Sequence, residues 1–524
     1  MLLLSSIMVL QAGCASEEPA PAAQPIDTAG RTVAKRPTST RRGDQLVAPI
    51  ALYPDAWPRW ALAMAFLGLD ACSLGPRYTR PDIPVPADWR TGDHSPPAQP
   101  SSTQLPAPTW PSAEWMRGFN SPQLDELIRQ AQAANDDLAA AVARVREADA
   151  QVRVTGAALL PSVSANANAS RQRQISLTQT ASSFNSFSPT LAASYEVDFW
   201  GKNRAIRDAA RMAAAASRYD RATIELTVMM SVVTTYFQTL ELRDRLRVAE
   251  ENLSRGQTVL DDLRLQQEVG TVNALDVAQQ ATTVATLGAV VPPLKQQLLQ
   301  TIDALAILIG KEPQAVNLGD ATLADLSEPR VGPGLPSELL TRRPDVAAAE
   351  AQLMAANANV AAAKAAFFPN IALTAGGGYM STALSTLFTP ASRIFSVTGG
   401  VTQPIFQGGA LSGQYQFNKA RYSELVADYH KAVISAFSNV QDALVAVQQT
   451  AEQEQRQQDA VNEARDAYEL SQAQWHAGVI NILTVLNTET VLFTAQDALV
   501  RVKSSHMQAL VALFGALGGG WQRA

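Results

Sequence analysis

The chain has 524 residues, of which 47% are apolar and only 6% aromatic, and its formal net charge is −6 at pH 7. The apolar content is therefore mostly Ala, Leu and Val, which suits close-packed helices better than β-sandwiches. No basic stripe or cluster of stacking aromatic residues is present, which excludes nucleic acid as a partner. No apolar run reaches the length of a transmembrane helix, so any membrane crossing must be made by strands.

Two segments near the N-terminus resemble export signals that end at a cysteine. The first ends at Cys14 and the second, over residues 59–72, ends Leu69-Asp70-Ala71-Cys72. Small residues before a cysteine resemble a lipoprotein processing box, in which the thiol is acylated. Cys14 and Cys72 are the only two cysteines, so a disulfide framework for the body is excluded. We predict that the lipid is carried by Cys72, with Cys14 as the alternative.

Residues 15–58 are rich in Pro, Ala, Ser and Arg and are expected to be disordered. The stretch 45–55 within them resembles the opening of a different family of secreted proteins of unknown function. We therefore interpret residues 1–58 as a disordered N-terminal extension that arose from a fused or misplaced gene start. On this interpretation the segment 59–72 is the native signal, and an extended segment over 73–120 follows it.

The remainder of the chain is duplicated. Residues 157–163 match residues 365–371 at an offset of about 208, and residues 270–277 match residues 478–485 at the same offset. Phe199-Trp200-Gly201 matches residues 406–408 at nearly the same offset. Three separated matches at one offset predict two tandem copies of one unit, over residues 121–333 and 334–524.

Each unit shows the same order of predicted elements. A helix opens it, at Ser121 and Pro122 in the first copy and at Pro344 and Asp345 in the second. It is expected to stop at the proline of the first match, and about ten residues with a period of two follow, as in outer-membrane barrel strands. Two hairpins result, with long polar loops expected over 172–188 and 380–392. The hairpin base is predicted at Pro161, Trp200, Gly201, Pro369, Phe406 and Gly408.

A long helix is predicted after each hairpin, over about 204–269 and 409–477. At 1.5 Å per residue each helix would be roughly 100 Å long. Apolar or small residues in the first of them alternate spacings of four and three, which is typical of a coiled-coil seam. An ordinary helical bundle is the alternative, but ordinary helices average about twelve residues. The seam comprises Leu242, Leu246, Ala249, Leu253, Gly256, Leu260 and Leu263.

Four strands per chain cannot close a barrel, and an open edge in lipid leaves backbone groups unsatisfied at several kcal/mol each. Closure therefore requires more than one chain. Two chains would give eight strands, whose interior is filled by side chains, whereas three would give twelve strands and an aqueous lumen. We therefore predict a homotrimer whose long helices continue the wall of the tube as a periplasmic α-barrel.

The residues that follow Cys72 resemble the TolC-type outer-membrane efflux channels, in particular the NodT-like lipoprotein subgroup of resistance-nodulation-division efflux systems. The resemblance covers residues 72–524, and its most specific stretch is Arg342-Arg343-Pro344-Asp345-Val346. Further matching stretches are 72–78 with Pro81, Trp115 with Phe119, 135–138, 143–148, 195–201, 334–341 and 516–521. The resemblance implies a mostly helical fold with a transmembrane β-barrel portion, built from two tandem repeats and trimeric. It also implies a passive exit duct for small molecules, driven by an inner-membrane pump through a periplasmic adaptor.

The family further implies that the turns after the long helices form the periplasmic tip, where adaptor hairpins dock. The corresponding residues are Gly270, Thr271, Val272, Leu275, Asp276, Val277, Gly478, Val479, Ile480 and Leu483. Surface apolar residues often mark interaction sites, so we expect Val272, Val479 and Ile480 to be exposed. Family members often place acidic residues at the aperture. Here those positions are Thr484 and Asn487, which argues against a strong cation-binding ring.

Three other functions were considered. An enzyme is disfavoured, because no phosphate loop, nucleophile elbow, cofactor motif or metal-spaced cluster is found. The four histidines, His94, His430, His476 and His506, are isolated in the sequence. A structural coiled-coil surface protein does not explain two amphipathic hairpins at one repeat offset. A type I protein-secretion channel remains the alternative within the channel class.

Overall fold

The structure is a computed structural model, and it describes residues 77–86, 88–89, 110–175, 181–329, 331 and 336–523. The chain divides into two units, residues 1–68 and 69–524, and every described residue belongs to the second unit. Cys14, Cys72 and the two signal-like segments lie outside the described residues, as does the extension over 1–58.

The first repeat opens with a short 3-10 helix, η2 (Trp115–Phe119), and then α3 (Pro122–Ala134). Ser121 caps α3 by accepting a hydrogen bond from the backbone N–H of Leu124 at 3.3 Å, and Pro122 takes the first helical position, as expected. The other elements of the repeat are α4 (Asp136–Gly156), β1 (Ser162–Ile175), β2 (Ala181–Val197), α5 (Lys202–Glu268) and α6 (Ala274–Leu308).

The opening helix of the first repeat is interrupted at Asn135, whereas the sequence predicted one continuous helix. The Asn135 side chain accepts a hydrogen bond from the Leu138 N–H at 3.1 Å and donates to the Leu308 carbonyl at 2.9 Å. Asparagine is a strong helix cap, and Asp136 and Asp137 favour the positive end of a helix dipole. The single-helix prediction was wrong because these local signals start a second helix.

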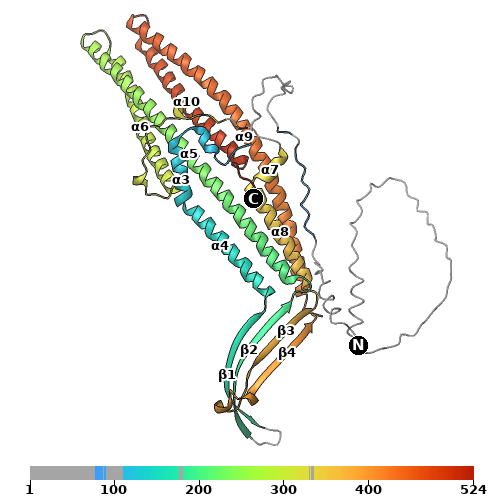
Figure 1. Cartoon of the computed structure of the whole chain (residues 1–524). Helices are drawn as coiled ribbons and strands as arrows, with labels where there is room; N and C mark the ends of the chain where they lie inside the picture. Colours follow the sequence, from blue (N-terminus) through green and yellow to red (C-terminus); the bar gives the residue numbers. More distant parts are fainter. Residues whose placement is uncertain are drawn as a thin grey trace, which may run out of the picture. The chain divides into compact units, whose positions relative to one another are not determined.

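The second repeat has α7 (Pro336–Arg342), α8 (Pro344–Ala365), β3 (Asn370–Tyr379), β4 (Arg393–Thr402), α9 (Ala410–His476) and α10 (Ile482–Ala516). Both α5 and α9 have 67 residues, and each begins and ends within two residues of its predicted bounds. The long helices extend away from the four strands, which gather at the other end of this unit (Figure 1). Among the described residues, no helix combines the length and the hydropathy required to cross a membrane.

The strands form one antiparallel sheet in the order β1-β2-β3-β4. The first hairpin is longer than predicted, because Gln172 pairs with Phe184 and Ile175 pairs with Ala181 in the ladder. Most of the loop expected over 172–188 is therefore strand. The polar composition of this segment suggested a loop, but the backbones of β1 and β2 continue the ladder through it. The second loop, over 380–392, lies between β3 and β4 as expected.

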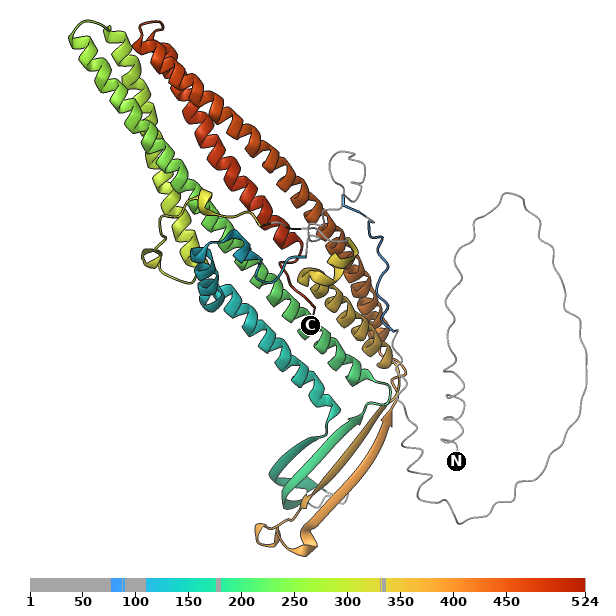
Figure 2. The same ribbon diagram turned by 45° about the horizontal axis from the view of Figure 1, so that its top comes forward.

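The helices α5 and α6 run side by side, as do α9 and α10 (Figure 2). The buried side chains of the helices form separate clusters. In the largest cluster, Trp115 stacks on Phe514 with ring centroids 4.6 Å apart, and Phe119 meets Phe237 edge-on at 5.0 Å. These contacts join η2 to α5 and α10. Along α5 and α6, the seam residues Leu242 and Ala249 are buried in a smaller cluster with Val291 and Leu294, as the heptad spacing predicted.

Candidate functional site

Each pair of long helices is joined by a tight turn, named here the first tip (residues 269–273) and the second tip (residues 477–481). Gly270 has φ +78° and Gly478 has φ +74°, a left-handed conformation that costs glycine little. At the first tip, the Gly270 and Thr271 N–H groups donate to the carbonyls of Gln267 and Gln266 at 3.0 and 2.9 Å. The second tip repeats this pattern, so both glycines end a helix through a Schellman-type motif.

An asparagine starts the next helix at both tips. Asn273 accepts a hydrogen bond from the Asp276 N–H at 3.0 Å, and the Asp276 carboxylate accepts from the Asn273 N–H at 3.3 Å. Asn481 accepts from the Thr484 N–H at 3.3 Å and from the Thr484 hydroxyl at 3.2 Å. Thr484 thus lies in the first turn of α10, where Asp276 lies in α6. Thr484 and Asn487, one turn apart and exposed, present neutral polar groups.

The exposure of the tips differs in part from the expectation. Val479, Leu275 and Leu483 are exposed at 71%, 63% and 46%. Val272 and Ile480, however, are half-buried, since they pack with Val277 against one cluster of buried side chains. The cluster comprises Leu263, Val461, Ala464, Tyr468, Ile482, Val485, Leu486, Leu492 and Ala495. The expectation of full exposure was wrong for Val272 and Ile480, because the two tips share this small core.

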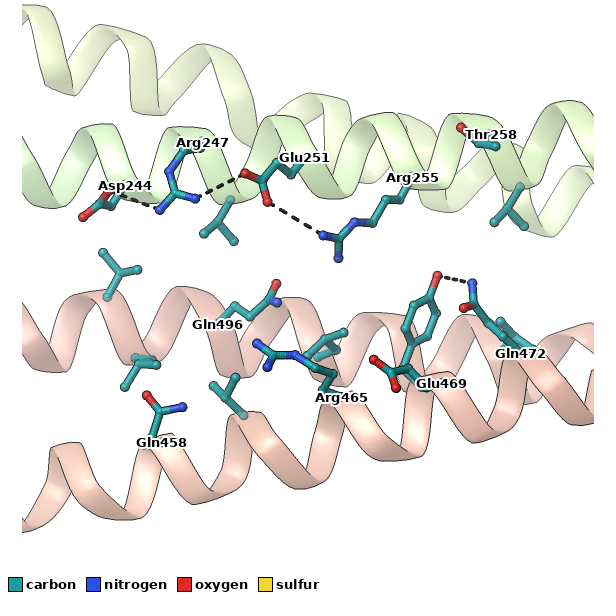
Figure 3. A pocket seen from close by; sticks show the side chains of 18 of the residues that line it. Asp244, Arg247, Glu251, Arg255, Thr258, Gln458, Arg465, Glu469, Gln472 and Gln496 are labelled. Atoms are coloured by element: carbon teal, nitrogen blue, oxygen red, sulfur yellow. Dashed lines mark hydrogen bonds and ion pairs between the residues drawn. The ribbon is translucent and has the colours of Figure 1, made fainter. Parts of the chain in front are cut away.

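A groove of about 830 Å³ lies between α5 on one side and α9 and α10 on the other. On the α5 wall, Arg247 pairs with Asp244 at 3.3 Å and with Glu251 at 3.2 Å, and Arg255 continues the chain to Glu251 at 3.8 Å (Figure 3). The charges along α5 therefore neutralise one another locally. Their spacing of three and four is visible in the sequence, but nothing there showed which face of the helix they share.

The opposite wall of the groove carries Arg465, Glu469 and Gln472 from α9 and Gln496 from α10 (Figure 3). Gln472 donates a hydrogen bond to the Tyr468 hydroxyl at 2.7 Å. Burial raises the pKa of the Tyr468 hydroxyl, and the Glu489 carboxylate raises it further. The groove is thus a polar surface between the two hairpins, with buried ionisable groups behind it.

Glu489 on α10 is buried, with 3% of its surface exposed, and neither carboxylate oxygen has a hydrogen-bond partner among the described residues. Burial raises the pKa of this carboxyl to about 7, against an opposing effect of the Arg255 guanidinium. A buried carboxyl without partners favours its neutral form, because charge without solvation is costly. No sequence pattern distinguishes Glu489, since a glutamate within a helix is ordinarily solvated.

At the opposite end of the helices, two residues of the predicted hairpin base, Trp200 and Pro369, are in contact. Trp200 donates a hydrogen bond from Nε1 to the Pro369 carbonyl at 2.9 Å and stacks on Phe368 with ring centroids 4.9 Å apart. Trp200 therefore ties the first repeat to the second. Gly201 has φ +76° and directly precedes α5, and Gly408 has φ +58° shortly before α9. Phe406 is 88% exposed, and Pro161 directly precedes β1.

The start of α5 is held by Asp198, whose carboxylate accepts from the backbone N–H groups of Asn203 and Arg204 at 2.9 and 2.8 Å. The same carboxylate pairs with the Arg204 guanidinium at 3.2 Å. Glu196 pairs with Lys202 at 2.5 Å. An acidic residue is favoured at the positive end of a helix, so Asp198 links strand β2 to the long helix rather than standing free.

The sheet separates apolar from polar side chains, as the period of two predicted. Val163 lies opposite Ala193, which lies opposite Ala375, which in turn lies opposite Val397. Several members of this apolar face are exposed, namely Val163, Leu191, Leu373, Phe395, Val397 and Val401. The other face carries Ser164, Asn166, Asn168, Ser194, Thr374 and Thr398. A sheet that exposes its apolar face and carries a polar opposite face matches a wall between lipid and water.

Comparisons with known proteins agree with this geometry. The family model of outer membrane efflux proteins matches residues 127–311 and 335–519. The pyoverdine export outer membrane protein OpmQ of Pseudomonas putida is 40% identical over 464 residues, which are 87% of this chain and 96% of that protein. The probable efflux pump outer membrane protein TtgC of Pseudomonas putida is 33% identical, over 88% of this chain and 95% of that protein.

Solved structures show the same architecture. The open-state MtrE outer membrane channel of Neisseria gonorrhoeae superposes with a TM-score of 0.76 at 29% identity, over 86% of this chain and 99% of that one. The expected fold class, mostly helical with few strands and two tandem repeats, is confirmed, and the proteins of this family are channel proteins. The chain therefore belongs to the outer membrane efflux protein family, and it is an outer-membrane channel subunit of an efflux system in a Gram-negative bacterium.

Proposed function

We propose that three copies of this chain form a passive exit duct. An inner-membrane pump of the resistance-nodulation-division type would supply it through a periplasmic adaptor protein. The sheet is the observation that carries the proposal. Its apolar face is exposed, and among the described residues β1 and β4 each pair with one strand only. Unpaired edges in lipid cost several kcal/mol for each backbone group. Three copies would join these edges into a twelve-stranded barrel with a water-filled lumen.

The first prediction concerns assembly. The protein solubilised in detergent should have three times the mass of the mature chain, because each copy supplies four strands. Mass photometry or light scattering corrected for bound detergent measures this directly. A stable monomer or dimer would overturn the trimeric duct.

The duct would do no catalytic chemistry, because the pump supplies the energy and selects the substrates. Small molecules are favoured over secreted proteins as cargo, since OpmQ, the relative at 40% identity, is named for export of pyoverdine. The type I protein-secretion channel remains the alternative function. Deleting the gene should raise sensitivity to small toxic compounds, whereas a deletion that stopped release of a polypeptide would favour the alternative.

We place the adaptor-docking surface at the two tips and the aperture beside the second tip. Exposed apolar side chains lie at or beside both tips: Leu275 follows the first tip, Val479 is in the second tip and Leu483 follows it. Surface apolar groups of this kind are common at interaction sites. The aperture would be lined by Thr484 and Asn487, which carry no charge and would not form a strong cation-binding ring.

The second prediction concerns the lipid anchor. We expect the mature chain to begin at Cys72 with an acylated thiol, because residues 69–71 resemble a lipoprotein processing box. Each buried methylene of an acyl chain contributes about 0.8 kcal/mol to membrane binding. Mass spectrometry of the mature N-terminus measures this modification.

The Cys72→Ser variant should lose the lipid but still assemble into trimers, because barrel closure rather than the lipid holds the chains together. A mature chain that begins at Cys14 and carries its lipid there would contradict both the Cys72 assignment and the misplaced gene start.

A further inference from the structure

Three side chains that are remote in the sequence converge beside the largest core cluster. They are Glu328 on the segment after the 3-10 helix η5 (Leu323–Asp325), Glu454 on α9 and His506 on α10. One ligand atom from each lies within 4.8 Å of the other two. His506 looked isolated in the sequence, since its two neighbours come from other segments.

Two neighbouring bonds determine which ring nitrogen of His506 carries the proton. The Thr450 hydroxyl donates to the Ala446 carbonyl at 2.7 Å, and this bond uses its one proton. Thr450 Oγ1 also lies 3.0 Å from His506 Nδ1 and must therefore accept a hydrogen bond from it. The proton of the neutral ring is thus on Nδ1, and Nε2 presents a lone pair.

The Nε2 lone pair faces carboxylate oxygens rather than a donor. Nε2 lies 3.8 Å from Glu328 Oε2, too far for a hydrogen bond, and His506 is only 6% exposed. Among the described residues, neither Glu328 nor Glu454 has a lysine or arginine partner, and no donor reaches Nε2. Three acceptors that converge without a lysine or arginine partner form a set of ligands suited to a cation.

We propose that Glu328, Glu454 and His506 bind a divalent first-row transition-metal ion of the zinc type. An imidazole nitrogen with two carboxylates suits such ions, whereas magnesium and calcium prefer oxygen ligands alone. Thr450 acts as a positioning residue, because metal-binding histidines usually donate their second N–H to a fixed acceptor. Thr450 and Glu454 lie one turn apart on α9, so a single helix face orients the histidine and supplies a ligand.

The segment that carries Glu328 is itself anchored. The Ser327 N–H donates to the Phe119 carbonyl at 3.0 Å, and Leu326 packs against the largest core cluster. The Glu328 side chain is exposed, which gives an ion access from solvent. A bound ion would tie this segment to α9 and α10. This inference goes beyond the proposed export function, because it is tested by metal binding to the purified protein.

The third prediction is the test of this site. The full chain is purified in detergent through a tag without histidines and treated with EDTA. Isothermal titration calorimetry with Zn²⁺ should show saturable binding of one ion per chain. His506→Gln and Glu454→Gln should each weaken binding at least about tenfold, and Thr450→Val should also weaken it by about tenfold or more. Zinc should raise the thermal unfolding midpoint of the parent protein more than that of these three variants.

Matched controls come from the same helix. Glu452→Gln and His430→Gln change exposed residues of α9 and should leave zinc affinity unchanged. Glu328→Gln alters an exposed side chain and tests the site even if His506→Gln reduces folding. Absence of saturable binding, or binding that Glu328→Gln and Glu454→Gln leave intact, would overturn the proposal. A protonated His506 paired with Glu328, detected by NMR titration together with no zinc binding, would also overturn it.

Discussion

Replacing Gly270 or Gly478 with aspartate is expected to abolish export while the amount of outer-membrane trimer stays near normal. Both glycines have positive φ, and apart from the adjacent residues a Cβ at either position would meet no atom of the described part of the chain within 4 Å. The strain of a non-glycine residue there is only about 1–2 kcal/mol, too little to unfold a long helical hairpin. The added charge would instead lie beside the exposed apolar residues Val479 or Leu275, where we place the adaptor.

The measurement is drug export and membrane trimer in the same strains. Gly478→Asn is the matched control, because asparagine has nearly the size of aspartate, tolerates positive φ and carries no charge. Its export should exceed that of Gly478→Asp at equal trimer levels. Normal export in the aspartate variants would remove the tips as the docking site. A parallel loss of folded trimer would mean that the glycines only terminate helices.

Raising the pH from 5 to 8.5 is expected to destabilise the protein through Glu489, and Glu489→Gln should remove that loss. The pKa of this carboxyl is about 7 when folded, above its ordinary value of 4.5, so the folded state binds the proton more tightly. Its stabilising effect is complete below about pH 4.5 and is lost as the pH rises through 7. The raised pKa corresponds to about 3 kcal/mol in the free energy of unfolding.

Thermal unfolding in detergent, followed by circular dichroism from pH 5 to 8.5, measures this effect. The Gln variant should exceed the parent in stability above pH 7 and lose the advantage near pH 5. Glu469→Gln, an exposed glutamate on α9, is the control and should follow the parent at every pH. The ionisable groups that face Glu489 are the charged Arg255 from α5 and the neutral Tyr468 from α9. A constant difference between parent and Gln variant across this range would refute the assignment.

Most of the fold could be predicted from the internal repeat and from the periodicity of apolar residues. The offset between residues 157 and 365 located both repeats, and period two correctly assigned Val163 and Val397 to one face of the sheet. Composition was the weaker guide. The polar composition of residues 172–188 suggested a loop, yet Gln172 to Ile175 extend the strand, because ladder hydrogen bonds use the backbone and not the side chains.

In the candidate sites, too, features set by local sequence rules were predictable and features set by long-range packing were not. The turn glycines were predictable, since a local rule places glycine just after a helix. The partial burial of Val272 and Ile480 was not predictable, because both residues pack on a core made from both hairpins. His506 and Glu328 are far apart in the sequence, and no spacing rule brings a histidine on α10 to a glutamate on a connecting segment. Glu489 follows a helical pattern like many solvated glutamates, and only the packing of α10 shows that it is buried.

The length of α5 and α9 has a mechanical consequence. Each helix has 67 residues and is about 100 Å long. Phe237 of α5 and Phe514 of α10 both pack on Phe119, and this aromatic contact lies far from the tips. Each long helix can therefore act as a lever that pivots about this aromatic contact. About 31 residues, or about 47 Å, separate Phe237 from the tip end of α5, so a tilt of about 1° at Phe237 displaces that end by about 0.8 Å. A small repacking around Phe119 would thus be transmitted along the helices as a larger displacement of the tips.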